Sequence, residues 1–387
     1  MNAIKKIQGS SFLRNRRYEA FVFLIAFFGF FGYLAHVMGT TNLLNTIMNT
    51  AWDLLMNTVF FILGITVLSG ALGKLMIEFG VVRLLEIFLA PLMRPVFKLP
   101  GVASLAGLMT FFSDNPAIIS LSNDKNFSKY FKKYELISLT NFGTAFGMGL
   151  IVLTFMSSFG YFGPAMIGFF GAVIGGVVST RLMQGMIKKQ FADEVVEDNI
   201  EDSSTISFKS KGGVFLRFLN SILDGGKSGV DLGLQIIPGV LIISTVIMII
   251  TFGPKDASLG YQGLAYEGVP VLPKIAGWLD WLFNGLFGFK KPELIAFPIT
   301  SLGAVGAALS IVKTFFSQGI ITGNEIAVFT AMGMCWSGFL STHTAMLDTL
   351  NYRNLTSRAI ISHTVGGIVA GTAAHYIYIL LSIWFTL

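Results

Sequence analysis

The chain has 387 residues, of which 53% are hydrophobic and only 12% are charged, and its mean hydropathy is +0.70. Soluble domains carry about 25% charged residues, so this chain has too little charge to cover a surface that faces water. That excludes a soluble globular enzyme, a disordered regulator and a nucleic-acid binder. The single cysteine, Cys335, excludes a disulfide framework and a multi-thiolate metal site. The composition therefore predicts an integral membrane protein.

Seven segments are long and apolar enough to cross a bilayer, which takes about 20 residues. They are residues 20–38, 53–73, 134–158, 161–180, 230–252, 325–347 and 357–384. The first follows a basic flank, but its apolar stretch is long and no A-x-A-like cleavage site follows it. We therefore expect a retained helix and not a cleaved signal peptide.

Two further apolar stretches, residues 101–122 and 293–316, are interrupted near their centres. The first contains Ser113-Asp114-Asn115-Pro116, and the second contains Pro298 together with polar residues and glycines. Such residues break a helix, and the backbone groups that they free must be satisfied by protein or by a water-lined cavity. Each stretch is either a kinked span or a re-entrant hairpin that enters and leaves on one side.

The distribution of basic residues distinguishes these two possibilities. The chain has 27 Lys and Arg against 21 Asp and Glu, a net charge of +6, and basic residues are enriched in cytoplasmic loops. With a cytoplasmic N-terminus and two hairpins, 22 of the 27 lie inside, and the five outside are Lys255, Lys274, Lys290, Lys291 and Lys313. Two full spans would divide the charges far more evenly. The positive-inside rule therefore favours hairpins, the first opening to the cytoplasm and the second to the outside, with the C-terminus outside.

Self-similarity indicates two copies of one unit. Four matches recur in the same order at a nearly constant separation: Trp52-Asp53-Leu54 with Val230-Asp231-Leu232, Phe97-Lys98-Leu99-Pro100 with Phe289-Lys290-Lys291-Pro292, Tyr134-Glu135-Leu136 with Asn324-Glu325-Ile326, and Gly175-Gly176-Val177-Val178 with Gly366-Gly367-Ile368-Val369. Each unit reads as span, amphipathic connector, hairpin, span, span. Three crossings per unit turn the second copy upside down relative to the first.

This pattern predicts four parts of the chain. They are a cytoplasmic N-terminus with the first span (1–50), a first repeat (51–187), a polar, acidic cytoplasmic linker (188–228) and a second repeat (229–387). Inverted repeats with broken helices at the midplane are typical of secondary transporters, whose site lies where the repeats meet. Gene duplication in a membrane scaffold without transport is the alternative.

The strongest candidate site is the centre of the first hairpin, with Ser113, Asp114 and Asn115. A carboxylate at membrane depth is costly and usually faces a cavity or a counter-ion. Asp114 is suited to coordinate Na⁺, to carry a proton, or to accept hydrogen bonds from a polar solute. The alternative role is a cap on the second half-helix, and capping does not exclude ligand contact.

Polar residues within other apolar segments complete the candidate set. Asn141 and Thr144 form a small, polar patch that serves either helix packing or ligand contact, and Asn141 is also a candidate for cation coupling. His343 is either a proton carrier, because the unperturbed pKa of histidine lies near neutrality, or a buried residue whose hydrogen bonds are all made within the helix packing. A hydrolase site formed by Ser341, His343 and Asp348 is disfavoured because all three lie on one predicted helix. The remaining candidates for solute contact are Thr300, Ser301, Ser337, Ser341 and Thr342.

With span, hairpin, broken span and inverted repeat, the sequence resembles the nucleoside-recognition, or Gate domain, superfamily. That group includes concentrative nucleoside transporters, the spore maturation proteins A and B and the membrane portion of ferrous-iron transport proteins. The resemblance covers the chain from about Asp53 and rests on its layout and on Pro100–Ala117, with the string SDNPA, and its partner Pro292–Gly306. The two-repeat layout is also similar to a fusion of the two spore maturation proteins.

The resemblance implies that hairpin tips and adjacent unwound helices bind a nucleoside and a coupling cation, and that a transport domain moves like an elevator. It implies a site lined by Asp114, Asn115, Asn141, Thr144, Ser301 and Ser337. The sequence departs from the nucleoside-transporter pattern in one respect. It lacks a second buried acidic residue in the matching half, where Ser337 and His343 are the nearest polar groups.

We therefore expect an all-α integral membrane protein of the bacterial inner membrane, with about seven transmembrane helices and two re-entrant hairpins in two inverted repeats. Its expected function is secondary transport of a small polar solute, nucleoside-like and coupled to Na⁺ or H⁺, and not enzymatic catalysis. Asp114, Asn141 and His343 are the coupling candidates. We expect no metal site, no other cofactor and no nucleic-acid partner, but a homo-oligomer, dimer or trimer. A non-transporting assembly or export factor of the spore-maturation type and an ion or metal channel are the alternatives.

Overall fold

The computed structural model describes residues 16–191 and 212–384, and within these ranges it contains helices and no β-strand. Six helical segments are long and apolar enough to cross a membrane: Tyr18–Met38, Thr40–Glu78, Lys133–Ser157, Phe162–Ile187, Val214–Thr251 and Arg353–Ser382. The predicted all-α, multi-pass membrane protein is thus confirmed. The basic residues before Arg16 and most of the predicted linker lie outside the described residues.

The first series of elements begins after α1 (Arg16–Met38). It comprises α2 (Thr40–Asp53), the π-helical turn η2 (Leu54–Val59), α3 (Phe60–Glu78), α4 (Val81–Leu92), η3 (Met93–Phe97), α5 (Ala103–Phe112), α6 (Pro116–Asn123), α7 (Lys125–Ser128), α8 (Lys133–Thr144), α9 (Gly149–Ser157) and α10 (Phe162–Ile187). The pair α5 and α6 forms the first hairpin, hairpin 1. The pair α8 and α9 forms one span that is interrupted between Thr144 and Gly149.

The second series repeats this order. It comprises α11 (Val214–Gln235), α12 (Ile237–Gly239), η4 (Val240–Ser244), α13 (Thr245–Thr251), α14 (Val271–Gly277), α15 (Asp280–Phe287), η5 (Pro292–Ile295), α16 (Ala296–Gly303), α17 (Val305–Ser317), α18 (Gly323–Cys335), α19 (Phe339–Thr349), η6 (Arg353–Leu355) and α20 (Thr356–Ser382). The pair α16 and α17 forms hairpin 2, and α18 with α19 forms the second interrupted span.

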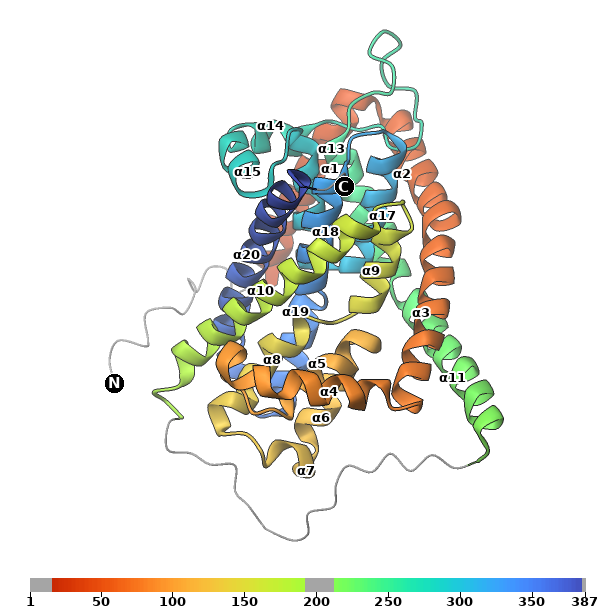
Figure 1. Ribbon diagram of the computed structural model, residues 1–387. Coiled ribbons are helices and arrows are strands. Elements are labelled where there is room, and N and C mark those ends of the chain that lie inside the picture. Colours follow the sequence, from red (N-terminus) through yellow and green to blue (C-terminus); the bar gives the residue numbers. More distant parts are fainter. Residues whose placement is uncertain (1–15, 192–211, 385–387) are drawn as a thin grey trace, which may run out of the picture.

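The two series point in opposite directions. We call the end of the molecule where α10 ends and α11 begins the linker side, and the other end the distal side. In Figure 1 the linker side is at the bottom, with α4, α6 and α7, whereas α14 and α15 lie at the top, where α20 also ends. Hairpin 1 therefore starts and finishes on the linker side, and hairpin 2 belongs to the distal side.

Several of the seven predicted spans differ in the structure: α10 runs to Ile187, beyond the predicted end at 180, and the predicted span 134–158 is interrupted between α8 and α9. The predicted span 325–347 is divided into α18 and α19, of 13 and 11 residues, so neither half crosses a membrane alone. The helices that contain the predicted spans 53–73 and 230–252 start earlier, at Thr40 and Val214. Hydropathy misses these early turns because they carry polar residues, and α11 has a polar face alongside an apolar one.

Glycines bring the repeat partners into contact. A Cβ on Gly225 of α11 would lie 2.4 Å from the carbonyl oxygen of Gly70 on α3, and one on Gly175 of α10 would lie 2.5 Å from the carbonyl oxygen of Gly366 on α20. Only residues without a Cβ permit helix backbones to approach this closely, as in other membrane helix pairs. The α3–α11 and α10–α20 pairs are among the most extensive helix–helix contacts of the described chain.

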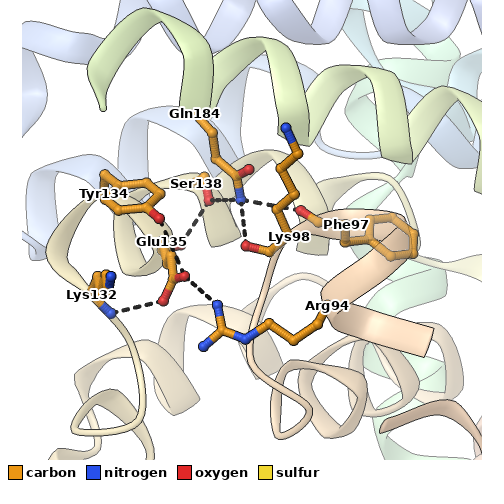
Figure 2. Close-up of polar contacts among 8 residues, drawn as sticks. All are labelled: Arg94, Phe97, Lys98, Lys132, Tyr134, Glu135, Ser138 and Gln184. Atoms are coloured by element: carbon orange, nitrogen blue, oxygen red, sulfur yellow. Dashed lines mark hydrogen bonds and ion pairs between the residues drawn. The ribbon is translucent and has the colours of Figure 1, made fainter. Parts of the chain in front are cut away.

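A buried carboxylate anchors the connector α4–η3 to the spans beside hairpin 1 (Figure 2). Glu135, which is 1% exposed, accepts a hydrogen bond from Arg94 at 2.6 Å and one from the backbone N–H of Lys132 at 2.9 Å. Gln184 of α10 donates to the carbonyl oxygens of Phe97 and Lys98 at 3.2 and 3.4 Å. These bonds fix both ends of the segment from which hairpin 1 rises.

The second repeat has a matching carboxylate. Glu325 accepts a hydrogen bond from the backbone N–H of Thr322 at 2.7 Å, as Glu135 does from Lys132, so both interrupted spans begin with the same cap. Beside it, Asn324 donates to the carbonyl oxygen of Phe287 at the end of α15 at 2.9 Å. The connector of each repeat is thus tied to the start of its interrupted span.

Candidate functional site

The interruptions of four helical segments meet around one cavity of about 420 Å³. Its wall combines the tip of hairpin 1, the tip of hairpin 2, both interrupted spans and the end of α11. The wall residues are Asp114, Asn115, Pro116, Ile119, Met148, Leu232, Gln235, Ile236, Gly239, Ala304, Val305, Gly306, Ala307, Ser337, Gly338, Ser341, Thr342 and Ala345. The volume lies in the range of about 300–1,000 Å³ that small-molecule sites have.

The cavity extends from the hairpin tips toward the linker side. Ile119 and Ala345 lie on α6 and α19, which run from the tips toward that side, and Leu232 lies near the end of α11, which begins there. Ser341 and Gln235 are exposed, so the wall is accessible to solvent in this conformation.

Local sequence explains the tip of hairpin 1. Pro116 occupies the first position of α6, where the missing N–H costs nothing. The Asp114 carboxylate accepts hydrogen bonds from the backbone N–H groups of Asn115 and of Met148 on the interrupted span α8–α9. Asp114 thus joins hairpin 1 to the interrupted span α8–α9. Its roles as a helix cap and as a ligand residue stay predictions.

Asn115 lies between the two interrupted spans. It is 6% exposed, and its Nδ2 donates to the backbone oxygen and to Oγ of Ser337, both at 3.4 Å. A Cβ on Gly147 would lie 2.3 Å from its Oδ1, and one on Gly338 would lie 2.6 Å from its Nδ2. The amide therefore occupies a slot that two glycines leave open, and its Oδ1 has no hydrogen-bond partner within the described chain.

Both interrupted spans restart in the same backbone conformation. Met148 precedes α9 with φ 52°, and Gly338 precedes α19 with φ 65°. The left-handed conformation costs roughly 1–2 kcal/mol for a residue such as methionine, and backbone strain of this kind concentrates at functional sites. Met148 and Gly338 both line the cavity, and the first turn of α19, with the partial positive charge of a helix N-terminus, lies beside it through Ser341 and Thr342.

The tip of hairpin 2 is uncharged. Ala304 is extended, with φ −163°, between α16 and α17, and Gly306 is close to Ile236 of the scaffold helix α11–α13. Asp114 is the one charged side chain that the described residues place in the wall, and Asn115, Gln235, Ser337, Ser341 and Thr342 supply its other polar side chains. The site therefore offers one carboxylate, two amides and three hydroxyls over an otherwise apolar surface.

The structure brings five of the sequence-predicted residues together in this wall: Asp114, Asn115, Ser337, Ser341 and Thr342. It places the other six elsewhere. Ser113 donates to the carbonyl oxygen of Met109, and Thr144 and Thr300 donate to carbonyl oxygens one turn earlier in their own helices. Ser301 is buried in α16 with no hydrogen-bond partner for its hydroxyl within the described chain.

Asn141 and His343 lie behind the wall, in the helix packing. Asn141 donates to Ser179 and Ser362, both at 2.9 Å, and to the carbonyl oxygen of Ala359 at 3.0 Å. His343 is fully buried and bonds through Nδ1 to the carbonyl oxygen of Phe339 at 2.5 Å. Their suggested roles in cation coupling stay predictions.

One polar wall residue was missed by the sequence reasoning. Gln235 ends α11 in the second repeat's first span, far in sequence from the hairpin tips. A lone amide three residues before Pro238 in an apolar span is the signal that marks this position. A helix break close to a polar side chain was the criterion that singled out Asp114, and it applies here too.

Comparison with known proteins supports the fold. No protein-family model matches the chain. Among solved structures, the chain is similar to a variant of the concentrative nucleoside transporter CNTnw in an outward-facing state, with a TM-score of 0.56, 12% identity, and coverage of 95% of this chain and 85% of that chain. It is also similar to CNTnw in an inward-facing, substrate-bound state, with a TM-score of 0.55, 13% identity, and coverage of 93% and 84%. The predicted likeness in layout to this class of transporter is confirmed at the level of the fold.

Two relatives match by sequence. The sporulation integral membrane protein YlbJ of Bacillus subtilis is 28% identical over 145 residues, which cover 36% of this chain and 33% of that protein. An uncharacterised protein of Alkalihalophilus pseudofirmus is 23% identical over 229 residues, which cover 53% of this chain and 46% of that protein. The chain thus spans less than half the length of these relatives. Membership of the Gate domain superfamily stays a prediction.

Proposed function

We propose that this protein is a secondary transporter that moves a small polar solute through the cavity between the two hairpin tips. The observation that carries the proposal is the meeting of four helix interruptions at one polar cavity. Breaking four helices within a membrane is costly unless the freed groups serve a site. A fold shared with concentrative nucleoside transporters supports the same conclusion.

The lining suggests the class of solute. A carboxylate, two amides and three hydroxyls present both donors and acceptors, and apolar residues such as Ile119, Leu232 and Ile236 form the remainder. A neutral solute with a polyhydroxyl part and a flat apolar part, such as a nucleoside, complements this surface. Movement of the hairpins and interrupted spans as one body past α3 and α11 would give elevator-type alternating access, and the gradient of Na⁺ or H⁺ would drive it.

We assign the linker side to the cytoplasm of a bacterial inner membrane. The proposal follows the basic residues, because Lys125, Lys129, Lys132 and Lys133 lie between hairpin 1 and α8 on that side. The conformation described here is then open to the cytoplasm. A dimer or trimer built on the scaffold helices would hold the fixed part of the elevator in place.

The test is uptake of radiolabelled nucleosides, bases and amino acids into proteoliposomes. Asp114→Asn removes the charge at the centre of the wall and should lower uptake about ten- to a hundredfold, since hydrogen bonds to charged groups contribute roughly 1.5–3 kcal/mol. Asp124→Asn is the matched control, because Asp124 caps α7 at the base of the same hairpin and lies outside the wall. Equal uptake by the two variants would refute the assignment of the site.

A second candidate function is a membrane assembly or export role during sporulation. The partial match to a sporulation integral membrane protein favours it. Within the described residues no group of three or more His, Cys, Asp or Glu side chains could hold a metal ion, so the structure gives no support to a metal channel. Folded protein that moves none of the tested solutes would favour the assembly role over transport.

A further inference from the structure

Two buried histidines lie behind the interrupted span α18–α19. The ring centroids of His343 on α19 and His363 on α20 are 4.7 Å apart, and both residues are fully buried. Ionisable residues inside a membrane protein are rare and generally functional. His363 was not singled out by the sequence, and the wall of the cavity includes neither imidazole.

Hydrogen bonds assign the protons of His363. Its Nε2 bonds to the carbonyl oxygen of Cys335, which only accepts, so Nε2 carries a proton. Its Nδ1 is 2.7 Å from Oγ of Ser179, which donates to it when the ring is neutral. Ser179 in turn accepts from Nδ2 of Asn141 at 2.9 Å, so both ring nitrogens of His363 and the Ser179 hydroxyl have partners with His363 uncharged.

His343 is arranged differently. Its Nδ1 bonds to the carbonyl oxygen of Phe339 and therefore carries the proton. Its Nε2 is then a lone pair, fully buried and without a hydrogen-bond partner in the described chain. A buried acceptor without a partner costs about 1–3 kcal/mol, so the position requires an explanation. A proton is the smallest ligand that this atom can take.

Within residues 16–191 and 212–384, no charged side chain forms a hydrogen bond or ion pair with either imidazole. The titratable groups on the surrounding helices lie apart from the pair: Asp348 of α19 and Arg358 of α20 are each five residues, about 7.5 Å, along their helices and are exposed. Arg181 of α10 is exposed, Glu135 of α8 is bound to Arg94, and the α18 thiol at Cys335 is buried. The described parts of α6 and α16, which also pack against α19, have no titratable residue. An imidazolium here would be a buried, unpaired charge, so the described conformation holds both rings neutral.

The pair is connected to the cavity wall. His363 binds the carbonyl oxygen of Cys335, and its own carbonyl oxygen accepts from Nε1 of Trp336 at 3.1 Å, so it holds the break that leads into Ser337 and Gly338. His343 follows Thr342, whose side chain lines the wall. A proton on His343 would require α19 to shift, and that shift would move the wall.

We propose that His343 and His363 form a proton-binding site whose occupancy is coupled to the cavity through α19. The described conformation is the proton-free state, and Nε2 of His343 takes the proton in a conformation that opens the pair to water. The proposal deepens the proposed transport function, since its coupling role rests on it, and it names H⁺ as the coupling ion. The existence of the proton site itself does not require a known solute.

The test uses ¹⁵N-histidine-labelled protein in lipid nanodiscs, followed by NMR from about pH 8 to pH 5, the range in which an ordinary histidine changes charge. The protein has four histidines, so His343→Gln and His363→Gln assign their own signals. We expect opposite neutral tautomers at pH 8, with Nδ1–H at His343 and Nε2–H at His363, and conversion of His343 to imidazolium as the pH falls. A His343 ring that stays neutral down to pH 5 in the folded protein would overturn the proposal.

A transport measurement separates this proposal from the proposed function. With uridine and adenosine as probes, a pH gradient of one unit coupled to one proton supports up to about tenfold accumulation in proteoliposomes. His343→Gln should abolish this accumulation and retain exchange at equal pH, whereas His375→Gln, bonded to Asn324 near the distal side, should behave as wild type. Uptake that is independent of the pH gradient would refute coupling to H⁺ but would still support the transport function. If His343 titrates but neither uridine nor adenosine is taken up, transport of these solutes is refuted and the proton site is still supported.

Discussion

Replacement of Gly147 by alanine tests the slot that holds Asn115. Gly147 does not have a positive φ, so alanine adds a methyl group without backbone strain. That methyl carbon would lie 2.3, 2.5 and 2.6 Å from Oδ1, Nδ2 and Cγ of Asn115, and real Cβ atoms essentially never approach within 3.0 Å. The amide must therefore leave the slot, and overpacking of this kind costs about 1–3 kcal/mol.

A double-mutant cycle isolates this contact. Asn115→Ala alone should cost about 1–3 kcal/mol, because it removes the hydrogen bond to the Asp114 carboxylate at 3.1 Å and the longer ones to Ser337. In the double variant the added methyl group meets no amide, so its stability should equal that of Asn115→Ala. The coupling energy should then match the clash, about 1–3 kcal/mol.

The assay is equilibrium unfolding of the purified protein in detergent, together with uptake into proteoliposomes. Gly185→Ala is the control, because nothing lies within 4 Å of its Cβ position on α10, and it should be neutral or slightly stabilising. If the destabilisations by Gly147→Ala and Asn115→Ala simply add, the two residues do not touch and the described wall is incorrect. Gly147→Ala should also lower uptake, because it displaces a polar group from the wall.

Three other changes test the framework around the site. Glu135→Gln should lower the free energy of unfolding by about 2 kcal/mol, measured by denaturant titration, because it weakens the bonds from Arg94 and from the backbone at the start of α8. Gly225→Ala should separate α11 from α3 and cost about 1–3 kcal/mol in the same assay, since the added carbon meets backbone. Tyr266→Phe should cost about 1 kcal/mol by thermal unfolding, because it removes a 2.5 Å hydrogen bond to Asp53.

The first two of these changes have a control within the chain. Arg83→Gln breaks an exposed ion pair with Glu86 and should leave stability within about 0.5 kcal/mol of wild type. Gly226→Ala is next to Gly225, but its Cβ would meet only a valine methyl group at 3.7 Å. Equal effects of Gly225→Ala and Gly226→Ala would contradict the close approach of α3 and α11.

Hydropathy and charge predicted most of the fold for simple physical reasons. Apolar length identifies spans, and the prolines and glycines inside residues 101–122 and 293–316 marked segments that a helix cannot cross unbroken. The repeated Glu135 and Glu325 mark the start of both interrupted spans, because each fills the same capping role. The inverted arrangement follows from the odd number of crossings per repeat.

The composition of the wall was less predictable. When a helix is surrounded by protein on all sides, periodicity does not show which face meets the cavity and which packs against a neighbour. The side chain of Asn141 can donate and accept hydrogen bonds as a solute-binding residue would, but it lies on the face of α8 that packs against Ser179 and Ser362. His363 and Gln235 come from elements distant in sequence, and only the tertiary arrangement brings them to their partners.

The central claim is that solute passes between the two hairpin tips, and modification of the wall tests it directly. In a Cys335→Ala background, which removes the native thiol, Ser341→Cys places a single exposed cysteine in the cavity. Maleimide should react with this cysteine, and the adduct should abolish uptake of the solute that the unmodified variant accumulates; excess solute should slow the reaction. Fully labelled protein that transports at the unlabelled rate would show that solute does not pass through this cavity.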